Sequence, residues 1–373
     1  MAGPRRTSAL PLALTYALLI VYASLYPFQG WRDQGIAPWA FLSAPLPAYW
    51  TGFDVLSNVV GYAPLGFLLG VAVLRGTRGR FALVGPVAIA GVLSLCLESL
   101  QAYLPTRVPS NVDFVLNLIG ATFGACSAWL LEHSGLLDRW SRFRSRWFAV
   151  DARGVLVLLA LWPVALLFPA VVPFGLGQVY ERLDAALAQQ LAGTPFLNWL
   201  PLRETELQPL LPGVELVCVA LGALIPCLLG FCVIGSRLRR LVFLVFIIGL
   251  GLAGTALSAA LSFGPGHAWG WLTQPTQFGL VGAAALAVIL SLLPPRVSAA
   301  LALMALMLHL SLINQAPASP YFAQTLQTWE QGRFIRFNGL AQWVGWVWPY
   351  AALLVTLARL SRGQADVPRH SRR

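Results

Sequence analysis

Lysine is absent from this 373-residue chain, so all 25 of its basic residues are arginine. This excludes a Walker-type phosphate lysine and a lysine Schiff base. The five cysteines lie inside apolar runs without metal-ligand spacing, as small buried hydrophobic residues do. The four histidines form no H-E-x-x-H pattern, and neither a G-x-S-x-G elbow nor a phosphate-binding glycine loop occurs. The sequence therefore predicts no metal or cofactor and disfavours a conventional hydrolase, zinc protease or nucleotide enzyme.

Charge is also scarce. Only 10% of the residues are charged and 58% are hydrophobic, with a mean hydropathy of +0.71. A chain this apolar needs lipid as its solvent. Its net charge of +11 could suggest nucleic acid, but the arginines are spread over short segments between apolar runs rather than gathered in one patch. We therefore expect no nucleic-acid partner and interpret the arginines through membrane topology.

Apolar runs of roughly 17 to 25 residues can cross a bilayer core of about 30 Å as helices. Ten such runs predict an all-α, polytopic transmembrane bundle. The eighth run is short, and several are interrupted by glycine or proline. The predicted spans are 9–27, 54–74, 81–103, 112–131, 154–173, 213–235, 241–262, 278–293, 297–314 and 343–360.

The arginines orient these spans, because positively charged short loops stay in the cytoplasm. If every run crosses, 19 arginines fall on one side and six on the other. This predicts an inner-membrane protein with both termini in the cytoplasm. The first run follows Arg5 and Arg6 but lacks a convincing cleavage site, so we interpret it as an uncleaved anchor. The six arginines on the outer side are Arg32, Arg107, Arg182, Arg203, Arg333 and Arg336.

The longest basic connection separates four runs from six and predicts the module boundary. Its alternating arginines and aromatics either set topology or also grip anionic lipid headgroups. The predicted organisation is a four-helix module (1–135), a basic connection (136–153), a six-helix extension (154–360) and a basic tail (361–373).

Three outer loops are long enough to carry structure. Val179, Leu183, Leu187 and Leu191 share a helical face in the second, and Phe322, Leu326 and Trp329 share one in the third. Both stretches are either interfacial helices or connecting loops anchored by aromatic side chains. The three loops are 28–53, 174–212 and 315–342.

Ionisable residues within membrane helices are costly, so a group of them is a candidate functional site. Seven polar residues, here called the polar cluster, lie at the start of the second run, the end of the third, the following loop and the start of the fourth. Because successive helices alternate in direction, all seven should meet in one layer within about 8 Å of the outer helix ends. The cluster comprises Asp54, Asn58, Glu98, Gln101, Arg107, Asp113 and Asn117.

The spacing within each run places these residues on common faces. Asp54 with Asn58 and Asp113 with Asn117 are i,i+4 pairs, and Glu98 with Gln101 is an i,i+3 pair. Small residues at the same spacing favour close helix packing below the polar layer. We assign this packing role to Gly66 and Gly70, next to Pro64, in the second run, and to Gly120 and Gly124 in the fourth.

These motifs resemble the VanZ-like family of membrane proteins. The resemblance implies an integral protein of the bacterial envelope, in a family whose eponymous member is linked to teicoplanin resistance, but it supplies no reaction. Residues beyond about 135 carry no such likeness. The matching segments are Leu25-Tyr-Pro-Phe28, Asn58-Val-Val-Gly-Tyr-Ala-Pro64-Leu-Gly66-Phe, Glu98-Ser-Leu-Gln101 with Arg107, and Asp113-Phe-Val-Leu-Asn117-Leu-Ile-Gly120-Ala-Thr-Phe-Gly124.

Three interpretations of the polar cluster stay open. In the first, Arg107 holds the phosphate or carboxylate head of a lipid or lipid-linked envelope intermediate, the amides donate hydrogen bonds, and Glu98 is the candidate acid or base. In the second, the helices line a transport path, although the layer is shallow and the second half does not repeat it. In the third, Arg107 pairs with Glu98 or Asp113 and the cluster only fixes helix packing.

Overall fold

The computed structural model describes seven stretches of the chain. Within them it has twelve α-helices and no β-strand, apart from an isolated bridge between Phe148 and Ile234. The chain forms two compact units, Met1–Arg144 and Ser145–Arg373, and their boundary lies inside the predicted basic connection. The described residues are 9–26, 28–46, 52–76, 81–168, 170–199, 207–317 and 335–361.

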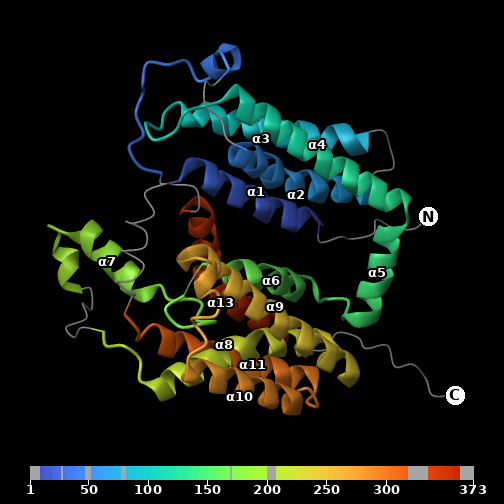
Figure 1. Ribbon diagram of the computed structural model, residues 1–373, viewed down its shortest axis with the longest axis vertical. Helices are drawn as coiled ribbons and strands as arrows, with labels where there is room; N and C mark the ends of the chain where they lie inside the picture. Colours follow the sequence, from blue (N-terminus) through green and yellow to red (C-terminus); the bar gives the residue numbers. More distant parts are fainter. Residues whose placement is uncertain are drawn as a thin grey trace. The chain divides into compact units, whose positions relative to one another are not determined.

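The first unit is a bundle of four helices followed by most of the basic helix α5, which continues past the unit boundary (Figure 1). Helices α2 and α4 make the most extensive contact in this unit, α3 packs against both, and α1 packs against α2 and α3. Tyr62, Leu65, Leu97 and Leu104 belong to its buried core. The helices are α1 (Ala9–Leu25), α2 (Gly52–Gly76), α3 (Phe81–Gln101), α4 (Asn111–His133) and α5 (Leu136–Trp147).

The second unit is built around α8, which packs against α6, α9, α10 and α11. Arg240, only 2% exposed, donates to carbonyls near the ends of α8 and α10, at Ile234 (2.7 Å) and Ser291 (2.9 Å). A buried arginine is tolerated because its N–H groups satisfy carbonyls that lack partners at helix ends. The helices are α6 (Arg153–Ala165), α7 (Tyr180–Leu191), α8 (Pro212–Val233), α9 (Arg237–Phe263), α10 (Gln274–Leu290), α11 (Pro295–Ile313) and α13 (Ile335–Ser361).

Seven helices in the described stretches are long and apolar enough to cross a membrane, namely α2, α3, α4, α8, α9, α11 and α13. Helices α1, α6 and α10 are apolar but shorter, at 10–17 residues. The all-helical, multi-pass character predicted from hydropathy is therefore confirmed. The count of ten crossings and the orientation of the termini stay predictions.

The fifth predicted span, 154–173, is wrong in its second half, because α6 ends at Ala165. The sequence places Pro163, Pro169 and Pro173 in this stretch. Proline lacks an N–H donor and disfavours helical backbone in the residue before it. Hydropathy alone counts the run as continuous, whereas its backbone cannot continue the helical hydrogen-bond ladder.

The connections differ in structure. The first outer loop holds a short 3₁₀ helix, Ala40–Ser43, and the second holds α7 and another 3₁₀ helix, Pro195–Trp199. The second loop thus contains a helix, and the position of this helix in the membrane interface stays a prediction. The helix considered around Phe322, Leu326 and Trp329 lies outside the described residues.

Candidate functional site

The polar cluster is tied together first by a contact between α2 and α4. Asn58 donates from Nδ2 to Oδ1 of Asp113 at 2.9 Å. Both side chains are half-buried. Asp54 lies in the first turn of α2, where a negative charge complements the helix dipole. The i,i+4 pairs predicted on these helices therefore belong to elements that face one another.

The start of α4 is built by Ser110, its N-cap residue. The Ser110 hydroxyl accepts a hydrogen bond from the Asp113 N–H at 3.2 Å, satisfying a donor that has no partner inside the helix. The N–H of Ser110 itself donates to Oε2 of Glu98 at 2.9 Å. In a capping box that N–H bonds to an acid on its own helix, whereas here a carboxylate from α3 accepts it.

Glu98 is a buried carboxyl group, only 4% exposed. Among the residues that the structure describes it forms no ion pair, and Asp113 lies close enough to act on it electrostatically. Burial of a carboxylate is costly unless it is paired or well supplied with donors. One N–H from Ser110 does not meet that need.

A second polar chain runs beside Glu98. Asn117, also 4% exposed, donates from Nδ2 to the Ser94 hydroxyl at 3.0 Å. The buried Tyr62 side chain interacts with both Ser94 and Glu98. The Oδ1 atom of Asn117 is buried and has no hydrogen-bond partner among the described residues. Glu98 and Asn117 thus leave acceptor capacity unused in one buried layer.

Arg107 and Gln101 face the end of α1 instead. Arg107 donates from Nη2 to the carbonyl oxygens of Ala23 (3.2 Å) and Tyr26 (2.5 Å). Gln101 donates from Nε2 to the carbonyl oxygen of Ser24 at 3.1 Å. Both side chains therefore cap the C-terminal end of α1, where carbonyls lack partners and positive charge is favourable. Among the described residues, Glu98 forms no ion pair with Arg107, and the alternative pairing of Arg107 with Asp113 stays a prediction.

Below the cluster, the predicted glycines lie where α2 and α4 touch. A Cβ atom at Gly66 would overlap the carbonyl oxygen of Ala121, and one at Gly124 would overlap that of Ala63. Gly120 approaches the Val59 carbonyl in the same way, and Gly70 lies against Ala128. Pro64 is inside α2. The missing side chains let the two backbones approach closely enough to align the polar residues above them.

Sequence reasoning missed Ser94, Tyr62 and Ser110. Ser94 precedes Glu98 by four residues and Tyr62 follows Asn58 by four, so each shares a helix face with a predicted residue. Ser110 and Asp113 have the spacing of an N-cap and its N3 residue. These signals were available, but serine and tyrosine are common enough in membrane helices that spacing alone did not separate them from packing residues.

No group of three or more potential metal-ligating side chains occurs in the described stretches. In the second unit, Glu215 accepts a hydrogen bond from the Thr273 hydroxyl at 3.3 Å, and His309 is buried at 1% exposure. Within the described residues, neither belongs to a group of three or more His, Cys, Asp or Glu side chains that could hold a metal ion. The polar cluster of the first unit is therefore the candidate functional site.

Residues 7–132 match the VanZ/LLP1 family model. The matched segment is about a third of the chain and includes α1 to α4. No curated protein and no solved structure matches the chain. The resemblance carried by the motifs around Asn58, Glu98 and Asp113 is thus confirmed. Residues 7–132, called the VanZ-like domain below because they match this family model, belong to a chain with seven described helices long and apolar enough to cross a membrane.

Proposed function

We propose that the VanZ-like domain binds the polar head of a lipid or lipid-linked envelope molecule. The observation that carries this proposal is the buried Glu98 carboxyl group, which lacks an ion pair among the described residues and lies in the layer of Asn117 Oδ1, an acceptor without a donor. A head that presents hydroxyl or ammonium groups would supply the missing donors.

The charge balance supports a donor-bearing head over a phosphate at this site. Asp54, Glu98 and Asp113 are acids, whereas the guanidinium of Arg107 is turned toward the carbonyls of α1. A phosphate placed here would meet more acceptors than donors. The proposed ligand contacts are therefore Glu98 and Asn117, with Asn58 and Asp113 holding α2 against α4.

The finer topology is also a proposal. Ten crossings of the inner membrane with both termini in the cytoplasm accommodate the split of 19 and six arginines. This arrangement puts the polar cluster at the outer face. In a variant without native cysteines, Thr106→Cys should react with an impermeant maleimide from outside the cell and Ser145→Cys only after permeabilisation. Labelling of both from the same side would contradict it.

The binding test compares Glu98→Gln with a control, Glu132→Gln. Glu132 lies near the C-terminal end of α4, away from the polar cluster at the start of this helix. Each protein is purified in native lipid nanodiscs, and bound molecules are identified by native mass spectrometry. We expect Glu98→Gln to lose an amphiphile that the wild type and the control retain, with thermal stability unchanged. Identical bound molecules in all three proteins would overturn the binding proposal. Equal loss of stability and binding in Glu98→Gln would favour a packing role.

A role in resistance to teicoplanin-type glycopeptides is the narrower form of the proposal, and it rests on the family resemblance. Production of the wild-type protein in a susceptible Gram-positive host should raise the inhibitory concentration of teicoplanin. The Glu98→Gln variant should not raise it, although it reaches the same level in the membrane. If the wild-type protein leaves the inhibitory concentration of teicoplanin unchanged, the role in resistance is wrong. The binding proposal would not be affected by that result.

A further inference from the structure

The second unit contains a non-helical segment buried among helices. Between Ala165, where α6 ends, and Tyr180, where α7 begins, the described residues form no helix, and Val172, Phe174 and Leu176 are at most 5% exposed. Phe174 and Gly177 have positive φ values of 63° and 91°. In a membrane protein, irregular backbone is tolerated only where it is buried in protein or lines a cavity.

The end of this segment is held by side chains from α13 and from the residue following α11. Asn314 accepts from the N–H groups of Val179 (2.9 Å) and Tyr180 (3.0 Å) and donates to the carbonyl of Gly177 (3.1 Å). The Tyr350 hydroxyl donates to the same carbonyl at 3.2 Å. The segment is therefore a rigid wall, which is the condition for a preformed binding site.

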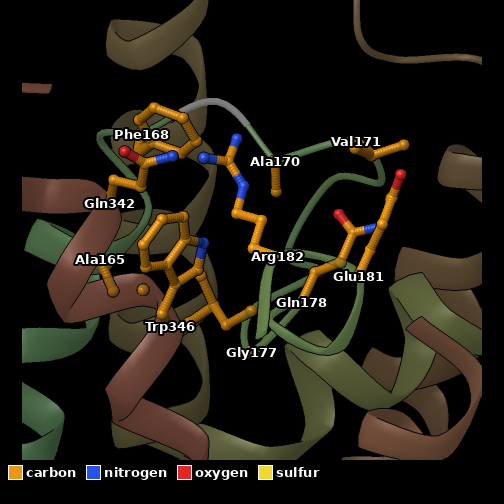
Figure 2. Close-up of a pocket in the computed structure, with 13 residues that line it drawn as sticks. Ala165, Phe168, Ala170, Val171, Gly177, Gln178, Glu181, Arg182, Gln342 and Trp346 are labelled. Atoms are coloured by element: carbon orange, nitrogen blue, oxygen red, sulfur yellow. The ribbon is translucent and has the colours of Figure 1, made fainter. Parts of the chain in front are cut away.

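A pocket lies between this segment, the start of α7 and α13 (Figure 2). Apolar and aromatic side chains form part of its wall, including Ala165, Phe168 and Trp346. Its polar lining includes Arg182 and Gln342, and Figure 2 shows the two side chains extending toward the same space beside Phe168. Glu181, the other charged lining residue, extends in a different direction.

The donors in this pocket are not used by the protein. The Arg182 guanidinium lies 4.9 Å from the centre of the Trp346 ring, a cation–π contact that leaves its N–H groups available. Within the described stretches, Arg182 has no hydrogen bond or ion pair, and the Gln342 amide has no hydrogen bond. Stacking on Trp346 holds the guanidinium in place, so little side-chain freedom is lost when an anion binds.

We propose that this pocket binds an oxyanion, a carboxylate or phosphate, carried by an amphiphile or free in solution. The Arg182 guanidinium would take two oxygens side by side, and the Gln342 amide would donate to a third or to a neighbouring group. Phe168 and Trp346 would cover the first apolar carbons attached to the anion. This site uses residues of the second unit alone and stands independently of the function proposed for the VanZ-like domain.

The test measures binding to the full chain in neutral detergent by native mass spectrometry. The probes are short-chain phosphatidic acid, octanoate and inorganic phosphate. The variant Arg182→Gln removes the charge from an exposed side chain that has no hydrogen bond with the described residues, so the fold should survive. The control is Arg296→Gln on α11, which removes a charge that is also exposed and belongs to the same unit. Thermal unfolding of each variant checks the fold.

We expect the wild type and Arg296→Gln to bind phosphatidic acid or octanoate alike, and Arg182→Gln to bind about tenfold more weakly or worse. Competition by inorganic phosphate would assign a free-anion site, and its failure to compete would assign an amphiphile site. The proposal is overturned if none of the probes binds the wild type. It is equally overturned if Arg182→Gln binds normally, or if both variants lose binding together.

Discussion

The polar cluster of the VanZ-like domain and the pocket of the second unit are opposites in hydrogen-bond chemistry. The cluster has an excess of acceptors among the described residues, because Glu98 receives only the Ser110 N–H, Asn117 Oδ1 receives no donor, and Arg107 donates to carbonyls of α1 and Tyr26. The pocket has an excess of donors, because Arg182 and Gln342 are not engaged by acceptors in the described residues. The two arginines thus differ, because Arg107 donates to carbonyls at a helix end whereas Arg182 has no such acceptor among the described residues.

The largest effect is expected at the glycines between α2 and α4, which let the two helices approach closely below the polar cluster. Gly124→Val would drive a side chain into the Ala63 carbonyl, and backbone cannot move aside as a flexible side chain can. We expect a loss of about 3 kcal/mol or more in unfolding free energy. Thermal unfolding in detergent measures it. Gly61→Val, at a position in α2 with nothing within 4 Å, is the control and should change stability far less.

Asn314→Ala should produce the next largest effect, in the second unit. It removes the acceptor of two backbone N–H groups and a donor to Gly177. We expect a loss of about 2 to 3 kcal/mol, because buried backbone groups are left without partners. Asn314→Asp keeps the acceptor and should recover part of this loss. The Asn314→Ala variant should also bind the oxyanion probes more weakly than the wild type. Unchanged affinity would mean that binding does not require the segment before α7 to be held by Asn314.

Arg107→Ala and Arg182→Gln should differ in their effect on stability. It should lower the unfolding free energy by about 1 to 3 kcal/mol, because two carbonyls at the end of α1 lose a charged donor. Arg182→Gln should leave stability nearly unchanged. Differential scanning fluorimetry of both variants makes the comparison direct. The assignment of Arg107 to helix capping would be wrong if its loss abolished ligand binding without lowering stability.

The smallest effect is expected at a surface ion pair. Arg359 contacts Asp151 at 2.7 Å, and the Asp151 side chain is 62% exposed. Such pairs contribute less than about 1 kcal/mol, and salt screens them. Asp151→Asn should therefore shift the unfolding midpoint only slightly, and the difference from wild type should vanish in 1 M NaCl. Persistence of a large difference at high salt would point to a buried coupling through Arg359, which also donates to the Cys232 carbonyl at 3.1 Å.

Much of the first unit was predictable because membrane helices have long, simple signals. The predicted runs around 54–74, 81–103 and 112–131 correspond to α2, α3 and α4 within a few residues. The non-helical stretch after α6 was not predictable, because a hydropathy count ignores the partners of the backbone hydrogen bonds. Pro169 and Pro173 were visible in the sequence, but they indicate only that the helix is interrupted. They say nothing of Asn314, which holds the interrupted segment from more than 130 residues away.

For the polar cluster, too, some features were predictable from the sequence and others were not. Alternating helix directions and i,i+4 spacing determined from sequence alone that Asn58, Glu98 and Asp113 share one layer. Which atoms bond within that layer depends on the rotation of each helix about its axis and on the path of the loop after α3. Only the tertiary structure decided that Arg107 caps α1 and that Glu98 receives the Ser110 N–H. The sequence thus determined the helical membrane class of the protein and predicted that its polar groups share a layer, because these depend on local patterns. The choice of partners is set by long-range packing.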